Sequence, residues 1–242
     1  MLNNSQDQNL FMNTIELATV NAVRIAVESL RRGTPILIID NEIEGEGDVC
    51  VAAQTVTADV VNFMVTACRG IVCQPITSEM SIKLNLPIMV PNGGSPAFAI
   101  TADAVSVGSG TSAHDRALTA RTIANPETRA DDLVRPGHIF PIIARPGGVL
   151  ERAGHTEAST DIIRLAGFTP SSVICEVMED DGHMARTASL LKFANKYGLA
   201  SITVRDIINF RNSTGEDLIL ASNYLAEPEA KASSNGNGKR PH

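Results

Sequence analysis

The apolar residues of this chain follow two patterns in alternation, a helical spacing of three or four residues and short continuous runs. The first helical pattern predicts a helix that begins at Asn13 or Thr14 and runs to about Arg32, with Gly33 at the position of a C-terminal cap. Its apolar positions are Val20, Val23, Val27 and Leu30. Similar spacing predicts further helices at about 58–67, 115–123, 156–165, 190–197 and 206–211.

Short continuous apolar runs predict buried strands between these helices. The clearest run is Ile36–Ile39, which follows Thr34 and Pro35. Further strands are predicted at 49–53, 71–73, 97–102, 139–144, 172–178 and 201–204. The segment 86–95 is interrupted by Pro and Gly, which indicates a loop. Helices that alternate with short strands indicate an α/β or α+β domain.

The composition favours one folded domain between two polar ends. Of 242 residues, 43% are hydrophobic, enough for a sizeable core, and the 4% of aromatic residues include no Trp, so the core is expected to be aliphatic. Residues 1–12 are predicted to be a flexible leader and residues 13–212 the catalytic domain. Residues 213–242 are predicted to be a largely disordered extension, because their end is poor in apolar side chains.

Charge and cysteine content argue against several classes of protein. The formal net charge is −7 and no basic stripe with interleaved aromatic residues occurs, which argues against nucleic-acid binding. The four cysteines form no Cys-x-x-Cys pair, which excludes a zinc ribbon and favours reduced thiols in a cytoplasmic protein. The first residues lack the features of a signal peptide, and no apolar run is long enough to span a membrane.

An acidic run directly follows the 36–39 strand. Five carboxylates occur within nine residues, and glycines separate the last three. They are Asp40, Glu42, Glu44, Glu46 and Asp48. Oxygen ligands on a turn suit a hard divalent cation such as Mg²⁺, while a solvated acidic loop explains the run equally well by itself.

Three further positions are candidates for chemistry. His155 begins a predicted helix after Arg152, and a guanidinium, backbone amides and the Thr156 hydroxyl at a positive helix end would form a phosphate cradle; a structural histidine is the alternative. Glu176 interrupts an apolar strand, where a carboxylate is either paired or has a pKa shifted for acid–base catalysis. His138 follows a Pro-Gly turn. Together these residues indicate a magnesium-dependent enzyme that acts on a small phosphorylated substrate.

Eight blocks between about Thr14 and Arg211 give the chain a specific resemblance. They are 44–48 (EGEGD), 70–73 (GIVC), 112–116 (SAHDR), 135–138 (RPGH), 147–150 (GGVL), 152–157 (RAGHTE), 173–176 (VICE) and 184–186 (MAR). In this order they resemble the 3,4-dihydroxy-2-butanone 4-phosphate synthase family of riboflavin biosynthesis.

The resemblance implies an α/β (α+β) domain with a mixed sheet surrounded by helices, and a homodimer whose site is completed across the interface. It also implies conversion of ribulose 5-phosphate to 3,4-dihydroxy-2-butanone 4-phosphate and formate, with Mg²⁺ or Mn²⁺. By position, Glu44 and His155 are similar to the family's metal ligands, and His138 and Glu176 to its residues essential for catalysis. The implied substrate-binding positions are Ile43, Glu44, Asp48, Arg152, Ala153, Gly154, His155, Thr156 and Glu176.

Several substrate-side positions depart from the family pattern. Ile43 stands where relatives carry Arg, Gly108 and Ser109 replace two Thr residues, and Pro96 replaces another Thr. These changes leave open a paralogue that acts on another phosphorylated ketose, or a non-catalytic dimeric paralogue. Retention of both implied metal ligands and both implied catalytic residues favours a working enzyme.

Overall fold

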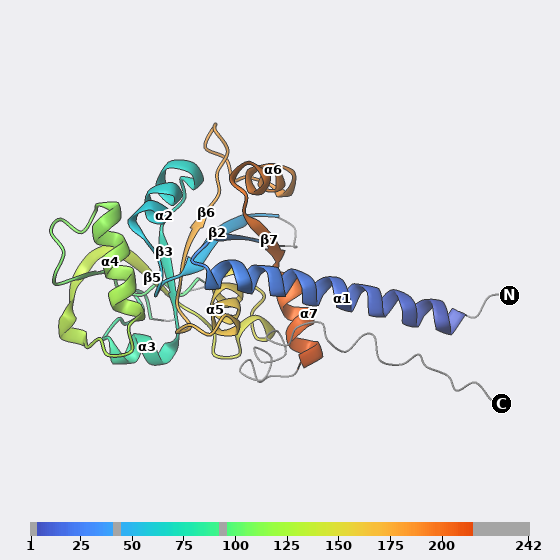
Figure 1. The fold of residues 1–242 in the computed structure, drawn as a ribbon. Coiled ribbons are helices and arrows are strands. Elements are labelled where there is room, and N and C mark those ends of the chain that lie inside the picture. Colours follow the sequence, from blue (N-terminus) through green and yellow to red (C-terminus); the bar gives the residue numbers. More distant parts are fainter. Residues whose placement is uncertain (1–3, 41–44, 92–95, 215–242) are drawn as a thin grey trace, which may run out of the picture.

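The computed structural model describes residues 4–40, 45–91 and 96–214. Within these residues the chain forms one mixed sheet of seven strands in the order β4-β5-β3-β6-β2-β1-β7 (Figure 1). The strands are β1 (Ile36–Ile39), β2 (Gly47–Ala52), β3 (Cys73–Ile76), β4 (Ala102–Ala104), β5 (Leu133–Ile143), β6 (Ser172–Glu176) and β7 (Ala200–Thr203). The mixed sheet with surrounding helices confirms the fold class predicted from the sequence.

Helices cover both faces of the sheet. One face packs against α1, α5 and α7, and the other packs against α2, α4 and α6. The helices are α1 (Asn4–Arg31), α2 (Ala58–Phe63), α3 (Ser78–Lys83), α4 (Ala113–Ala124), α5 (His155–Leu165), α6 (Thr187–Tyr197) and α7 (Val204–Thr214). A π-helical turn, η1 (Met64–Cys68), continues α2, and η2 (Ala130–Asp132) and η3 (Gly148–Leu150) are single 3₁₀ turns.

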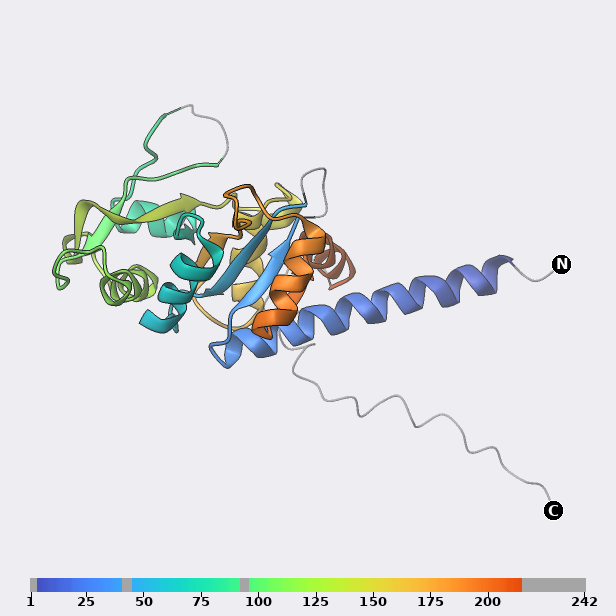
Figure 2. The ribbon, with the colours of Figure 1, turned by 90° about the horizontal axis from the view of Figure 1, so that it is seen from above.

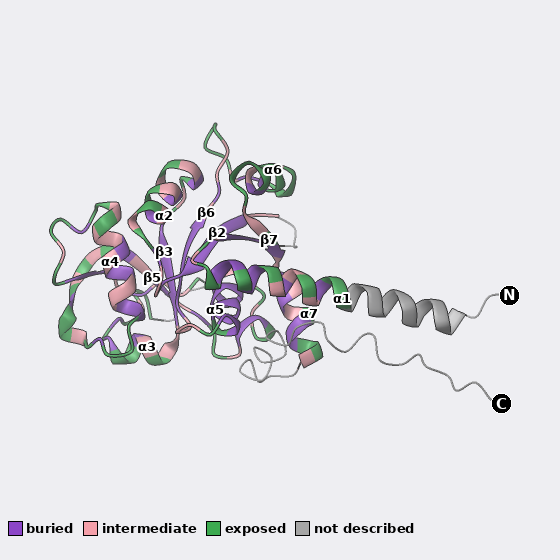
Figure 3. Cartoon of the chain, in the orientation of Figure 1, coloured by how far each residue is buried: buried purple, intermediate pink, exposed green. Residues whose placement is uncertain are grey.

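Strand β1 is the second strand from the β7 edge of the sheet, and all four of its residues are buried. Figure 3 shows the same burial (purple) along the labelled strands β2, β3 and β6. Ile36 and Ile38 pack into the core on the α5 side, while Leu37 and Ile39 pack into the core on the α2 side. β1 pairs antiparallel with β2 and parallel with β7. A run of four aliphatic residues is what a strand covered by helices on both sides requires, so this prediction is confirmed.

Local signals set several helix ends as the sequence predicts. The Thr57 hydroxyl caps α2 by accepting a hydrogen bond from the Val60 amide at 3.3 Å. Gly33 follows α1 with φ +73°, and Gly198 follows α6 with φ +65°. Both glycines adopt the left-handed conformation that ends helices and that side chains disfavour.

Several boundaries of predicted elements are wrong. The strand predicted at 139–144 begins at Leu133, so the Pro-Gly turn predicted before His138 lies within β5. Helix α1 begins at Asn4 rather than at Asn13 or Thr14, and its first part extends well beyond the sheet and its helices (Figure 2). Most residues before Asn13 are polar, and the apolar residues 10–12 form one continuous run without helical spacing, so the pattern gave no sign of this extension. The strand predicted at 71–73 begins only at Cys73, because the Ile71 amide instead donates to the Glu176 carboxylate.

The prediction of a strand at 97–102 is also wrong, and the short helix α3 was not predicted. The strand β4 begins only at Ala102. Phe98 and Ala99 form isolated bridges with Ile142 and Ile88, so this apolar segment lies beside β5 without forming a continuous ladder. Helix α3 has only six residues, too few for an apolar period to be recognised.

Some predictions fall on residues outside the described ranges. Ile43 and Glu44 lie in 41–44, the end of the predicted 86–95 loop lies in 92–95, and nearly all of the predicted C-terminal extension lies in 215–242. All four cysteines are within the described residues, where they are buried and free. None of the described helices combines the length and apolar character needed to cross a membrane.

Candidate active site

Two carboxylates and a thiol meet on the α5 face of the sheet. Asp48 of β2 stands directly opposite Glu176 of β6 in the antiparallel ladder, and Cys73 of β3 pairs with Ile174, two residues before Glu176. Alternate residues of a strand share one face. Since Cys50, Cys73 and Ile174 belong to the core on the α5 side, Asp48 and Glu176 lie on that side too.

Burial dominates the ionisation of these two carboxyl groups. Burial raises the pKa of Asp48, and His155 opposes the rise. Burial also raises the pKa of Glu176, and the negative charge of Asp48 raises it further. The Ile71 amide donates to Glu176 Oε2 at 2.8 Å, which partly favours the charged form. Two like groups facing each other in a buried place are typical of acid–base sites.

The charges of Asp48 and Glu176 also act on the thiol of Cys73. Burial raises the pKa of its thiol, and the charges of Glu176 and Asp48 raise it further. The thiol therefore stays protonated at neutral pH, which makes it a poor nucleophile. The sequence analysis did not single out this cysteine, although the 70–73 block contains it.

His155 is the first residue of α5, with Gly154 as its N-cap. Its Nε2 atom is buried and has no hydrogen-bond partner among the residues that the structure describes. An unpartnered buried imidazole nitrogen is costly by itself and fits a ligand to a cation. Glu44, the other predicted metal ligand, lies outside the described residues, and within those residues no group of three or more His, Cys, Asp or Glu side chains is arranged to hold a metal ion.

The predicted phosphate segment leads into the same helix end. Arg152 is partly exposed, and its Nη1 donates to Glu157 Oε2 at 2.6 Å. Thr156 is buried in the first turn of α5, while Gly154 and His155 are half-buried. A guanidinium beside the N-terminus of an eleven-residue helix creates the positive potential that a phosphate group needs.

A second cluster contains the predicted catalytic residue His138. The backbone amide of His138 donates to Asp103 Oδ1 at 2.9 Å, and its ring Nδ1 lies 2.7 Å from Asp103 Oδ2. Asp103, on β4, is only 5% exposed. Because an ionised carboxylate can only accept, Nδ1 carries the proton and donates, which leaves Nε2 free to accept a proton from elsewhere. The sequence analysis missed Asp103.

Gly110 closes over this histidine–aspartate pair. It adopts φ +80°, and its amide donates to Asp115 Oδ2 at 3.2 Å. A Cβ at this position would lie 2.1 Å from Asp103 Oδ2 and 2.5 Å from His138 Nδ1. Only glycine therefore allows the loop to approach the pair so closely.

The two clusters remain separate within one chain. Both adjoin β3: Phe140, two residues after His138, pairs with the same Cys73 that pairs with Ile174. Nevertheless, across the described part of the chain, no hydrogen bond or ion pair links His138 or Asp103 to Asp48, Glu176 or His155. The structure thus brings Asp48, Glu176 and His155 together and leaves His138 apart.

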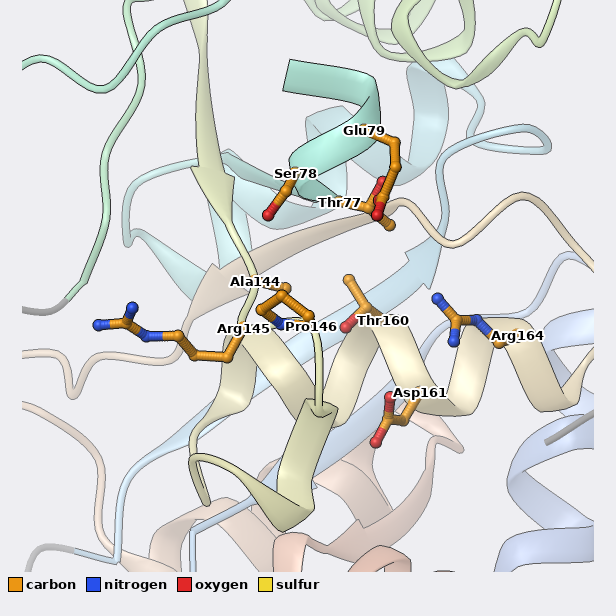
Figure 4. A pocket seen from close by; sticks show the side chains of 9 residues that line it. All are labelled: Thr77, Ser78, Glu79, Ala144, Arg145, Pro146, Thr160, Asp161 and Arg164. Atoms are coloured by element: carbon orange, nitrogen blue, oxygen red, sulfur yellow. The ribbon is translucent and has the colours of Figure 1, made fainter. Parts of the chain in front are cut away.

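A cavity of about 170 Å³ lies at the C-terminal ends of β3 and β5, whereas Cys73 is at the N-terminal end of β3 (Figure 4). The lining residues are Thr77, Ser78, Glu79, Ala144, Arg145, Pro146, Thr160, Asp161 and Arg164. In Figure 4, the Arg145 side chain extends away from the other lining residues, while Arg164 points toward Thr160. None of the predicted site residues that the structure describes lines this cavity.

Comparison with known proteins gives a consistent result. A family model described as 3,4-dihydroxy-2-butanone 4-phosphate synthase matches residues 24–210. The chain is 46% identical over 198 residues to the riboflavin biosynthesis protein RibBA of Aquifex aeolicus, covering 79% of this chain and 49% of that protein. It is 48% identical over 198 residues to a 3,4-dihydroxy-2-butanone 4-phosphate synthase of Pseudomonas syringae pv. tomato, covering 80% and 54%.

Solved structures extend this similarity to the fold. A 3,4-dihydroxy-2-butanone 4-phosphate synthase in complex with two magnesium ions has a TM-score of 0.75 and 35% sequence identity, covering 78% of this chain and 95% of that one. The chain spans about half the length of the curated relatives it matches.

Proposed function

The chain belongs to the 3,4-dihydroxy-2-butanone 4-phosphate synthase family, and on this basis we propose that it converts ribulose 5-phosphate to 3,4-dihydroxy-2-butanone 4-phosphate and formate in riboflavin biosynthesis. The observation that carries the proposal is the meeting of Asp48, Glu176 and His155 at one end of the sheet, next to a helix N-terminus suited to phosphate. The proposal includes a cytoplasmic location, which the free buried cysteines support.

The reaction requires several proton transfers at the carbons of a ketose phosphate. Enolisation, loss of a hydroxyl and expulsion of a one-carbon unit each need an acid or a base near the reacting carbon. Glu176 has a raised pKa and therefore exchanges protons closer to neutral pH than an ordinary carboxylate does. His138 contributes an imidazole whose tautomer Asp103 fixes, with Nε2 free as the base.

Glu44 and His155 are the proposed ligands of a divalent cation. The buried, unpartnered Nε2 of His155 supports this role. When bound, the cation polarises the oxygens of the sugar as a Lewis acid. The Glu44 carboxylate, together with open positions for substrate oxygens, suits Mg²⁺ or Mn²⁺, because both ions prefer oxygen ligands.

The segment 152–156 is proposed to bind the phosphate end of the substrate. Arg152 provides a fixed positive charge and N–H donors beyond the one that bonds to Glu157, and Thr156 together with the first amides of α5 provides further donors. Ala153 and Gly154 present backbone close to the ligand. Asp48, and Ile43 in the acidic loop, would face the sugar.

A homodimer is part of the proposal. His138 and Glu176 must act on one substrate, yet no hydrogen bond or ion pair links their clusters within the described part of one chain. A second copy related by twofold symmetry would supply His138 to the cluster that contains Glu176, and closed symmetry would form two equivalent sites. Light scattering at micromolar concentration is expected to report twice 25.7 kDa, and a purely monomeric species of 25.7 kDa would contradict this arrangement.

The decisive experiment is incubation of the purified protein with ribulose 5-phosphate and Mg²⁺, followed by an assay for formate. Formate should appear, chelator should stop its release, and added Mg²⁺ should restore it. Glu44→Ala should remove the activity. Full activity of Glu44→Ala in the presence of chelator would refute the metal assignment. Formate release from another ketose phosphate only would instead support a paralogue with a different substrate.

A further inference from the structure

Glu157 is a buried carboxylate, 1% exposed, both of whose oxygens are occupied. Oε1 accepts from the Arg145 backbone amide at 3.0 Å, and Oε2 accepts from Arg152 Nη1 at 2.6 Å. Arg145 follows the last residues of β5, and Arg152 lies just before α5. One side chain therefore ties together the two ends of the connection between this strand and this helix.

A second carboxylate, one helical turn further along α5, holds the middle of the same connection. Asp161 Oδ2 accepts from the Val149 amide at 3.0 Å and from Arg211 Nη1 at 2.8 Å. Arg211 Nη1 also donates to the Gly147 carbonyl at 2.7 Å. The two acids thus have separate tasks: Asp161 fixes the backbone at 147–149, while Glu157 is the one that contacts a side chain of the phosphate segment.

The space around the Arg152–Glu157 pair is closely fitted. A Cβ on Gly154 would lie 2.4 Å from Arg152 Nη1 and 3.1 Å from Glu157 Oε2, so the absence of a side chain at 154 makes room for the pair. Glu157 also lies in the first turn of α5, where the helix dipole favours a negative charge. The guanidinium is consequently held against the helix N-terminus in one position.

We infer that Glu157 is a positioning residue for substrate binding, which acts through Arg152. By accepting one N–H of the guanidinium, it orients the remaining donors toward the helix end where the phosphate group of the substrate binds. An arginine that is already oriented loses less conformational entropy when a ligand arrives, so the affinity for phosphate rises. This inference rests on the proposed function of segment 152–156. It goes beyond that function because it assigns the orientation of Arg152 to Glu157, a residue outside the segment.

The test uses the full chain and inorganic phosphate as the probe. Calorimetric titration with phosphate should show that Glu157→Gln weakens binding about tenfold, as expected for loss of one charge-assisted hydrogen bond. In the formate assay the same variant should raise KM for ribulose 5-phosphate by about the same factor and leave kcat within about threefold of the parent, because the acid–base groups lie elsewhere.

A double-mutant cycle separates positioning from a general structural role. If Glu157 acts through Arg152, then Glu157→Gln should have no further effect on phosphate affinity in an Arg152→Ala background. Asp161→Asn is the matched control, since it removes a buried carboxylate from the same helix. Its effect on phosphate affinity should add to that of Arg152→Ala.

Each outcome bears on the inference. Additive effects of Glu157→Gln and Arg152→Ala, an unchanged phosphate affinity in Glu157→Gln, or a parent protein that does not bind phosphate would each overturn it. If Glu157→Gln does not fold, Glu157→Asp, which is shorter by one methylene, is measured in the same cycle with the same expectation. If the parent binds phosphate with the expected coupling but releases no formate, the inference stands and the proposed reaction fails.

Discussion

Asp48 and Glu176 face each other directly across β2 and β6, on the side of the sheet where α5 begins. Like charges at opposed positions of an antiparallel pair are destabilising, and burial raises the pKa of both groups. The pair therefore lowers the free energy of unfolding at neutral pH. The protein thus loses some free energy of unfolding where two proton-exchanging carboxyl groups lie next to each other.

The first prediction is that Glu176→Gln stabilises the protein while removing its activity. A raised pKa means that the folded state binds more protons than the unfolded state, so stability falls as pH rises above about 4, the ordinary value of a carboxyl group. Removing the charge should raise Tm at pH 7 by about 2–4 °C, the change expected from about 1 kcal/mol.

The advantage of Glu176→Gln should shrink as the pH is lowered toward 4, because the parent carboxyls then become protonated. Thermal melts of the parent and the variant between pH 7 and pH 4 measure this difference in Tm. Glu127→Gln, at an exposed glutamate, is the control and should leave Tm unchanged. A variant no more stable than the parent at pH 7 would contradict the assigned cost of the pair.

A second prediction concerns the partner of His138. In Asp103→Asn the side-chain amide no longer requires a proton on Nδ1, so the imidazole can adopt the other tautomer and lose its basic Nε2. The rate of formate release should fall about a hundredfold, within the usual contribution of a positioned acid or base. Melting temperature is measured in parallel, and a normal kcat in a folded variant would show that Asp103 does not support catalysis.

Gly110 and Gly108 form a matched pair for a third prediction. A methyl group at Gly110 would overlap Asp103 and His138 and would require φ +80° of an alanine, whereas nothing lies within 4 Å of a Cβ at Gly108. Gly110→Ala should therefore reduce activity about as much as Asp103→Asn and should also lower Tm, since a strained backbone costs about 1 kcal/mol or more. Gly108→Ala should leave Tm unchanged, and an equal loss of Tm in the two variants would refute the close approach.

The sequence predicted those features best whose signal lies in a few neighbouring residues. The run Ile36–Ile39 predicted a buried strand. Glycines at 33 and 198 marked helix ends because they take a conformation that other residues avoid. Glu176 could be identified as a candidate site residue because a carboxylate in an otherwise apolar strand is costly to bury. In each case a few neighbouring residues contain the whole signal.

Long-range pairings produced the errors and the omissions. Asp103 has no local motif, and its importance depends on the bulged pairing of β4 with β5 that brings it to His138. Cys73 became relevant only when the sheet order placed β3 next to β6. The order itself could not be predicted, since β1 pairs with β7 from the far end of the chain.

The last prediction rests on Ile43, which precedes the proposed metal ligand Glu44. The family resemblance implies an arginine at this position, and isoleucine lacks the five donors and the fixed charge of a guanidinium. Losing one charge-assisted hydrogen bond to a bound substrate costs about 1.5–3 kcal/mol, a factor of roughly ten to a hundred. Ribulose 5-phosphate should therefore be turned over weakly compared with a relative that carries Arg, and Ile43→Arg should raise kcat/KM.

Formate release from ribulose 5-phosphate, compared between the parent and Ile43→Arg, decides the question. Ile43→Lys is the control, because it restores the charge without the planar fork of donors and should recover only part of the rate. If the parent prefers another ketose phosphate, one less polar at the end facing Ile43, then Ile43→Arg should shift that preference toward ribulose 5-phosphate. A parent that already works as fast as its Arg-bearing relatives, and that Ile43→Arg slows, would show that the acidic loop recognises its substrate without a guanidinium.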